Sequence, residues 1–261
     1  MTDSSSMTRA AEALSGCKQI MVFTGAGVST ESGIPDFRGP EGLWTKLDPE
    51  DFHIDRYMSS RRVRVMRWRL HQQGELLGAA SQVKPNAAHL AIVDLWKAGR
   101  LTGCVTQNID GLHQEAGLPD DLVSELHGNV RKTGCMSCPA QWPTAEVIEW
   151  VNAGQEEPRC PQCGGIVKTA TVSFGQMLPE REIQKARFFS AMADGVLVIG
   201  STLSVFPAAE FPASAARSGI PMVIINLGET AFDHLAAAKL SLPAGEAVPS
   251  LVAALGAEVG E

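Results

Sequence analysis

Four of the six cysteines form two pairs whose spacing is typical of a metal site. Cys135 and Cys138 make the first C-x-x-C pair, and Cys160 and Cys163 make the second, with residues 139–159 between them. Two such pairs at this separation predict a tetrahedral Cys₄ zinc site. Because four thiolates leave no open position for water, we expect this zinc to be structural and not catalytic. Disulfides or free thiols are the less favoured alternative in a chain without secretory features.

A glycine turn is the second candidate functional feature, because its composition suits phosphate binding. The apolar run Ile20–Phe23 predicts a buried strand, and it leads almost directly into Gly25-Ala26-Gly27. Glycine admits positive φ and lets a ligand approach the backbone closely, which favours a pyrophosphate. The fingerprint G-x-G-x-x-G is incomplete, however, because Thr30 stands at its third glycine. Taken alone, such a turn is more often plain strand-to-helix architecture than a nucleotide site.

The segment after this turn strengthens the case for a ligand. Residues 33–39 read GIPDFRG, so a proline, an acid, an aromatic ring and a guanidinium lie between two glycines. This composition suits a loop that covers a ligand better than it suits any regular element. We therefore expect Asp36, Phe37 and Arg38 to belong to such a loop.

Small or polar residues also follow three other apolar runs. Leu101–Thr106 precedes the polar segment 107–113, Val196–Ile199 precedes Gly200-Ser201-Thr202, and Met222–Ile225 precedes Asn226. In an open α/β sheet, ligands bind beyond the carboxyl ends of the strands. We expect these strand ends and the glycine turn to gather around one site.

The elements that must position these residues are read from the apolar periodicity. A helix is predicted from Pro85, at its first position, to Gly99, and further helical stretches cover 180–193 and 208–218. Residues 40–84 are irregular but mostly helical, which we interpret as an insertion. Strands and helices alternate elsewhere, so the sequence predicts an α/β fold with a doubly wound parallel sheet.

Composition excludes several functional classes. The 261 residues carry a formal net charge of -7, and four glutamates lie between the cysteine pairs, so we expect no direct nucleic-acid binding. No apolar stretch reaches the length of a membrane span, and residues 1–7 are polar and serine-rich, unlike a secretory signal. We therefore expect a cytoplasmic protein that does not bind membranes.

One dense basic run interrupts this acidic chain. It consists of Arg61, Arg62, Arg64, Arg67 and Arg69. Because runs of one charge are usually surface features, we interpret it as a solvated helix face and not as a site for phosphate or an acidic partner.

Taken together, the motifs resemble those of the sirtuin family, the NAD-dependent protein lysine deacylases, in their bacterial form. The matching segments run in family order across most of the chain. They are GAGVST (25–30), GIPDFRG (33–39), TQNIDGLH (106–113), LHGNV (126–130), the two cysteine pairs, VSFGQ (172–176), GSTLSVFPA (200–208) and INL (225–227).

The resemblance implies two lobes with a cleft between them. A Rossmann-like NAD-binding lobe would comprise residues 1–40, 85–130 and 168–261. The small lobe would combine the helical insertion at 41–84 with the zinc ribbon at 131–167. NAD would be a co-substrate and Zn²⁺ a structural metal. The NAD contacts implied are Gly25, Ala26, Gly27, Thr30, Ile34, Asp36, Phe37, Arg38, Gln107, Asn108, Ile109, Asp110, Gly200, Ser201, Thr202, Ser204, Asn226 and Leu227.

The resemblance also assigns the chemistry and the substrate. His127 would be the general base, with Asn108 and Asp110 as further catalytic residues, and Val172, Phe174 and Gly175 would pair with an acyl-lysine protein. Nicotinamide would leave as the acyl oxygen attacks the ribose, and the products would be free lysine and O-acetyl-ADP-ribose. Alternatives are a mono-ADP-ribosyltransferase, a deacylase for longer or acidic acyl groups, and a non-enzymatic NAD-sensing or acyl-lysine-binding module.

The absence of one residue pair predicts which acyl group the protein prefers. Members that remove succinyl and malonyl groups carry Tyr-x-x-Arg in the helical insertion, where the arginine binds the acyl carboxylate. The only tyrosine here is Tyr57, and the third residue after it is Ser60. The sequence therefore predicts a preference for acetyl-lysine over succinyl-lysine.

Overall fold

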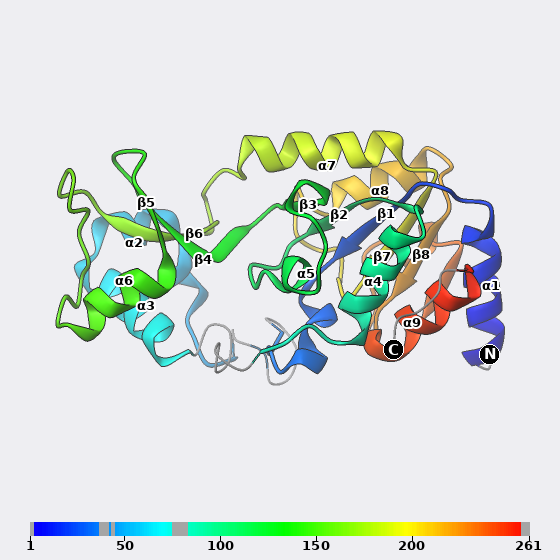
Figure 1. Cartoon of the computed structure of the whole chain (residues 1–261), viewed down its shortest axis with the longest axis horizontal. Coiled ribbons are helices and arrows are strands. Elements are labelled where there is room, and N and C mark those ends of the chain that lie inside the picture. Colours follow the sequence, from blue (N-terminus) through cyan, green and yellow to red (C-terminus); the bar gives the residue numbers. More distant parts are fainter. Residues whose placement is uncertain (1–2, 37–41, 43–44, 75–82, 257–261) are drawn as a thin grey trace.

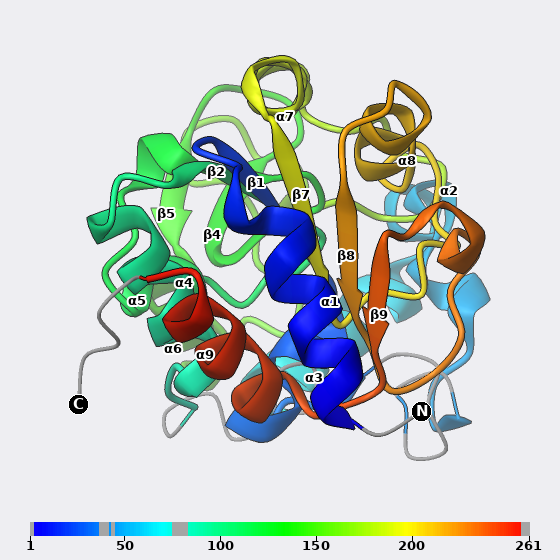
Figure 2. The same ribbon diagram turned by 90° about the vertical axis from the view of Figure 1, so that its right-hand side faces the viewer.

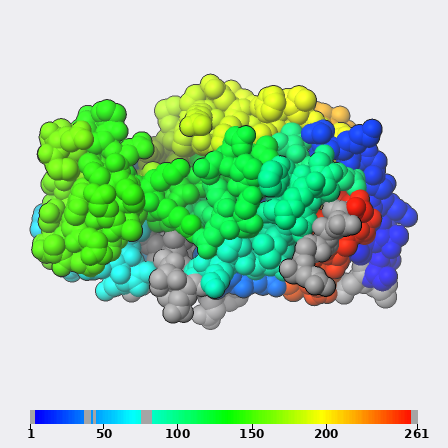
Figure 3. Space-filling view, viewed as in Figure 1, coloured from blue at the N-terminus to red at the C-terminus, as the bar shows by residue number. Residues whose placement is uncertain are grey.

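The computed structural model describes residues 3–36, 42, 45–74 and 83–256, and these form two lobes of unequal size (Figure 1). In the space-filling view the zinc-ribbon end of the molecule protrudes beyond the larger body (Figure 3). Within the described part of the chain, every helix is too short or too polar to cross a membrane.

The large lobe is built on a six-stranded parallel sheet in the order β3-β2-β1-β7-β8-β9. This order reverses direction between β1 and β7, which is the position where doubly wound sheets bind ligands. The strands are β1 (Ile20–Thr24), β2 (Leu101–Thr106), β3 (Val123–Glu125), β7 (Gly195–Ile199), β8 (Met222–Ile225) and β9 (Ala238–Leu240).

Helices cover both faces of this sheet (Figure 2). Alternate residues of β1 point to opposite layers: Ile20 and Val22 join the core under one set of helices, and Met21 and Phe23 join the core under the other. The first layer consists of α1 (Asp3–Ser15), α4 (Ala87–Lys97) and α9 (Ala244–Ala254). The second consists of α7 (Glu180–Met192) and α8 (Glu210–Arg217).

The small lobe has its own antiparallel sheet, in the order β5-β4-β6. Trp68 is almost fully buried there against Val147 and Val167, and Cys160 joins the same cluster. The elements are β4 (Gly128–Cys135), β5 (Gln141–Pro143), β6 (Val167–Thr171), α2 (Ile54–Ser59), α3 (Arg61–Gln73) and α6 (Thr144–Asn152). Helix α5 (Leu112–Glu115) and five 3₁₀ turns at 26–28, 30–32, 49–52, 120–122 and 233–235 complete the described elements.

The predicted fold class is confirmed, and one helix start is corrected. The four strands expected from apolar runs are β1, β2, β7 and β8. Helix α4, however, begins at Ala87 and not at Pro85. Asn86 is its N-cap, because the Asn86 side chain accepts hydrogen bonds from the backbone of Ala88 and His89 in a capping box. Pro85 therefore lies before the cap.

The glycines of the first turn serve close packing of two backbones. Neither Gly25 nor Gly27 has the positive φ that the sequence suggested, whereas Gly200 does, at 61°. The Gly27 N–H donates to the Gly200 carbonyl at 2.9 Å. A Cβ at Gly27 would lie 2.7 Å from the Gly200 Cα, and one at Gly25 would lie 2.7 Å from the Gly200 oxygen. Only glycine lets the loops after β1 and β7 meet in this way.

We expect Gly27→Ala to lower the free energy of unfolding by about 1–3 kcal/mol, because the new methyl group forces two backbones apart. Urea unfolding measures this change. Gly16→Ala is the matched control, since a Cβ at Gly16 meets nothing within 4 Å, and it should change stability by less than about 0.5 kcal/mol. Equal stability of both variants would contradict the packing role of Gly27.

Candidate functional site

A cleft of about 1170 Å³ lies beyond the carboxyl ends of β1, β2, β7 and β8 and extends to the small lobe. Most of the predicted site residues line it: Gly25, Ala26, Gly27, Thr30, Asp36, Gln107, Asn108, Ile109, His127, Val172, Phe174, Gly175, Gly200, Ser201, Thr202, Asn226 and Leu227. Ile34, Asp110 and Ser204 are not among the lining residues. Phe37 and Arg38 lie outside the described residues.

The His127 imidazole has a defined tautomer. Its Nδ1 lies 2.9 Å from the carbonyl oxygen of Gln107. Because a carbonyl only accepts, Nδ1 carries the proton and Nε2 keeps a free lone pair. Burial lowers the pKa of His127, while the hydrogen bond to Gln107 opposes this shift. The ring is therefore neutral at pH 7 and is able to accept a proton at Nε2.

A buried chain of hydrogen-bonded polar groups fixes the Asn108 side chain on the side away from the cleft. The Asn108 amide donates to the Ser29 hydroxyl at 3.1 Å, and Ser29 donates to the Asp110 carboxylate at 2.8 Å. Asp110 also accepts from the Leu112 N–H at 2.9 Å. Asp110 and Asn108 are 5% and 6% exposed. Asp110 thus lies beneath the cleft, where it orients Asn108 through Ser29.

A second buried network fixes the loop backbone, and its histidine was given no role by the sequence analysis. The Asn108 N–H donates to the Thr106 hydroxyl at 3.0 Å, and Thr24 donates to the same oxygen at 2.8 Å. His113 lies 2.9 Å from the Thr24 hydroxyl. Burial lowers the pKa of His113 to about 4, so it is a neutral structural group. The sequence did contain a signal for this role, since His113 ends the segment TQNIDGLH that was singled out for its polar residues.

The opposite side of the cleft is formed by the loops after β7 and β8. The Gln107 side chain crosses to this side and donates to the Ser201 hydroxyl at 2.8 Å. Asn226 donates to the Gly228 carbonyl at 2.9 Å, and Leu227 is 69% exposed. The Gln107 contact joins the loops after β2 and β7, and the Gly200 N–H ties the loop after β7 to the end of β8 by donating to the Ile225 carbonyl at 2.9 Å. This wall offers polar groups and an apolar surface to a ligand.

Residues 172–174 run between the two lobes and end in a turn at Gly175, whose φ is 75°. The Val172 N–H donates to the His127 carbonyl at 2.8 Å. Phe174 donates from its N–H to the Phe52 carbonyl at 3.1 Å and accepts from the Ile54 N–H at 2.9 Å. This segment is therefore anchored to the candidate base on one side and to the helical insertion on the other. An extended peptide beside it would lie next to His127.

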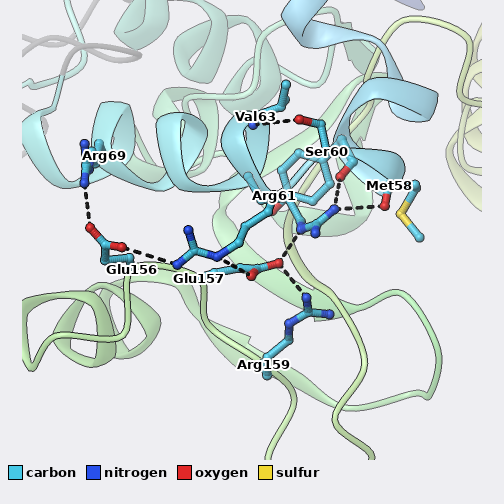
Figure 4. Close-up of polar contacts among 10 residues, drawn as sticks. Met58, Ser60, Arg61, Val63, Arg69, Glu156, Glu157 and Arg159 are labelled. Atoms are coloured by element: carbon cyan, nitrogen blue, oxygen red, sulfur yellow. Dashed lines mark hydrogen bonds and ion pairs between the residues drawn. The ribbon is translucent and has the colours of Figure 1, made fainter.

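The arginine run departs from the expected solvated face. Arg61, Arg62 and Arg69 are exposed, but Arg64 and Arg67 are only 6% and 5% exposed. Arg61 and Arg69 reach Glu156 on the loop that precedes the second cysteine pair (Figure 4), and Arg64 reaches Glu157 on the same loop. These ion pairs tie α3 to the zinc ribbon. Arg67 instead lines the cleft, and the sequence analysis did not single it out.

The four paired cysteines fit a zinc ion. Their Sγ atoms all lie within 4.8 Å of one another, and none forms a disulfide. The Sγ atoms of Cys135 and Cys163 are 3.5 Å apart, and those of Cys138 and Cys160 are 3.7 Å apart. Tetrahedral zinc with bonds of about 2.3 Å to sulfur requires about 3.8 Å between sulfurs. The donor set is complete without water, so the zinc is structural.

The comparisons with known proteins agree with this geometry. The model of the Sir2 family matches residues 25–207. NAD-dependent protein deacetylase 2 of Streptomyces coelicolor is 39% identical over 246 residues, which cover 93% of this chain and 100% of that protein. NAD-dependent protein deacetylase 1 of Bradyrhizobium diazoefficiens is 40% identical, covering 95% and 96%. A solved Sir2 structure with a deacetylated p53 peptide and 3′-O-acetyl ADP ribose is 36% identical, with a TM-score of 0.86 and coverage of 94% and 96%.

We expect Cys163→Ser to lose bound zinc and to lower the melting temperature, because metal binding to such ribbons contributes to their folding. Cys163 is exposed, so the substitution removes little packing. Metal analysis should find about one zinc per chain in the wild type and far less in the variant. Cys17→Ser is the control: because Cys17 lies outside the cluster, this variant should bind as much zinc as the wild type. Full zinc occupancy in Cys163→Ser would contradict the Cys₄ assignment.

Proposed function

Because the chain belongs to the Sir2 family and is an NAD-dependent protein-lysine deacetylase, we propose that His127 is its general base and that the cleft described above holds NAD and acyl-lysine together. The observation that carries this proposal is the His127 tautomer. Its Nδ1 is committed to the Gln107 carbonyl, and Gln107 itself lines the cleft. Nε2 is then the atom of His127 that takes a proton from the reacting groups.

We assign NAD to the strand ends of the large lobe. The loops that meet at Gly27 and Gly200 line the cleft and would receive the pyrophosphate, and Ser201 and Asn226 lie on the wall that would receive the adenosine half. Gln107 and Asn108 would contact the nicotinamide ribose. Asp110 acts through Ser29 and is a positioning residue in this arrangement.

The acyl-lysine substrate enters along residues 172–175. A peptide that adds a strand beside Val172 and Phe174 places its lysine in the cleft near His127, since the Val172 N–H is bonded to the His127 carbonyl. The acyl oxygen would bond to the ribose carbon of NAD as nicotinamide leaves, and a ribose hydroxyl would then attack the acyl carbon while a base takes its proton. His127 accepts the proton of that hydroxyl, which favours deacylation over simple transfer of ADP-ribose to a protein. A cytoplasmic location remains a prediction from the sequence.

We expect kcat/KM to be constant through neutral pH and to fall only below pH 6.5, the ordinary pKa of histidine. The base works as the neutral imidazole, and burial lowers the pKa of His127, so protonation begins at a lower pH than for a free histidine. The dependence of kcat/KM on pH is measured from deacetylation of an acetyl-lysine peptide between pH 5 and 9, and the fall at low pH gives the pKa of the base. A midpoint at or above the ordinary histidine value would contradict a buried His127 as the base.

We also expect His127→Ala to lose about 10²–10⁴-fold in the production of free lysine, the usual contribution of a positioned base. Nicotinamide release and free lysine are measured in parallel, with and without peptide. His234→Ala is the control, because His234 is exposed and does not line the cleft. Equal deacetylation by His127→Ala and wild type would refute the assignment of the base.

A further inference from the structure

Strand β6 is an edge strand of the small sheet, and its outer carbonyls are buried. In the described part of the chain the sheet has the order β5-β4-β6, so β6 pairs with a strand of that sheet on one side only. On that side the Ile166 carbonyl, directly before β6, accepts from the Met136 N–H at 2.8 Å. Because successive residues of a strand direct their carbonyls to opposite sides, those of Val167, Thr169 and Thr171 point to the outer edge. Buried carbonyls at such an edge need donors from side chains.

Two buried side chains supply these donors. The Tyr57 hydroxyl, from α2, donates to the Val167 carbonyl at 2.7 Å. The Lys168 amine donates to the Thr169 carbonyl at 3.2 Å and also to the Thr171 carbonyl. Tyr57 and Lys168 are each only 2% exposed. The three outer carbonyls of β6 are therefore satisfied without a further strand.

Among the residues that the structure describes, no carboxylate pairs with the buried Lys168 amine. Burial, with the charge of Arg67 on α3 as a second cause, lowers the pKa of Lys168 to about 7. His71, also on α3, is neutral because burial lowers its pKa to about 3. A lysine amine keeps at least two N–H groups in either protonation state, so it serves both carbonyls throughout neutral pH. Lys168 is thus placed here as a hydrogen-bond donor to backbone and not as the partner of an acid.

The carbonyl of Thr171 and the N–H of Val172 belong to one peptide group. Such a group is planar and trans, so its C=O and N–H point in opposite directions. Lys168 holds the carbonyl, while the N–H donates to the His127 carbonyl at 2.8 Å. The group is therefore held from both sides, by Lys168 and by the backbone of the candidate base. It lies where β6 ends and the segment 172–174 begins.

We propose that Lys168 is a positioning residue for the acyl-lysine substrate, because its bond to the Thr171 carbonyl fixes the peptide group that ties segment 172–174 to His127. Without this bond the peptide group is free to rotate, which takes the Val172 N–H away from the His127 carbonyl and changes the direction of the segment along the cleft. The inference rests on the proposed function, since it concerns how the same cleft receives the substrate peptide.

The test compares Lys168→Met with Tyr57→Phe on one acetyl-lysine peptide. Both variants remove a donor from the same buried edge, but only Lys168 bonds the peptide group beside His127. We expect Lys168→Met to raise the KM for the peptide by about 10-fold, the effect of losing a hydrogen bond to a charged group. The kcat should change much less, because the His127 ring keeps its bond to Gln107, and the KM for NAD should stay the same. Tyr57→Phe should lower the melting temperature and leave the peptide KM unchanged.

Hydrogen exchange at the Val172 amide, measured by NMR, reads the positioning role of Lys168 without turnover. We expect this N–H to exchange faster in Lys168→Met than in the wild type or in Tyr57→Phe, because its bond to the His127 carbonyl opens more often. If Lys168→Met does not fold, Lys168→Gln, which is neutral and one bond shorter, replaces it with the same expected direction.

Two results overturn the role of Lys168 while the enzyme is active. They are unchanged peptide KM and Val172 exchange in a folded Lys168 variant, and an equal rise of the peptide KM in Tyr57→Phe. A different result separates the two proposals. Faster exchange at Val172 in the Lys168 variant, in a protein whose wild type removes no acetyl group, overturns the proposed function and supports the role of Lys168 in holding the segment.

Discussion

The contact between the backbones of Gly27 and Gly200 is the constraint on which the site depends. It joins the loops after β1 and β7 at the point where the strand order of the sheet reverses. Because these loops touch without side chains between them, the cleft begins directly at the strand ends. Gln107 then reaches from the neighbouring strand to Ser201, and its carbonyl fixes the tautomer of His127. The Gln107 carbonyl thus determines which nitrogen of the base is free.

The small lobe completes the cleft. Together with the segment that joins it to the large lobe, it provides the surface against which a peptide and its acyl group would lie. Strands β4 and β6 link the two lobes, since β4 begins at Gly128, directly after His127, and pairs with Thr171. The zinc ribbon gives this lobe a rigid core, and the ion pairs of Glu156 and Glu157 hold α3 against it. The ribbon therefore helps to set the position of α3, which carries the cleft-lining Arg67.

The features that sequence predicted well are those encoded locally. Apolar runs ending in small or polar residues identified β1, β2, β7 and β8 together with the loops after them that line part of the cleft, and the cysteine spacing identified the cluster. The family resemblance placed Asp110 in the pocket, but its carboxylate accepts a hydrogen bond from Ser29 beneath the loop and does not line the cleft. The burial of Arg67 depends on packing against Phe52 and Tyr57, and helical periodicity in a run of arginines does not reveal which one faces the interior.

The central claim is that this cleft couples cleavage of NAD to removal of an acyl group from lysine through His127. Mass spectrometry of all products from one acetyl-lysine protein and NAD tests it most directly. The account predicts equal amounts of nicotinamide, O-acetyl-ADP-ribose and protein that has lost the mass of one acetyl group. Protein that gains the mass of ADP-ribose while keeping its acetyl group would contradict the account and identify the chain as an ADP-ribosyltransferase.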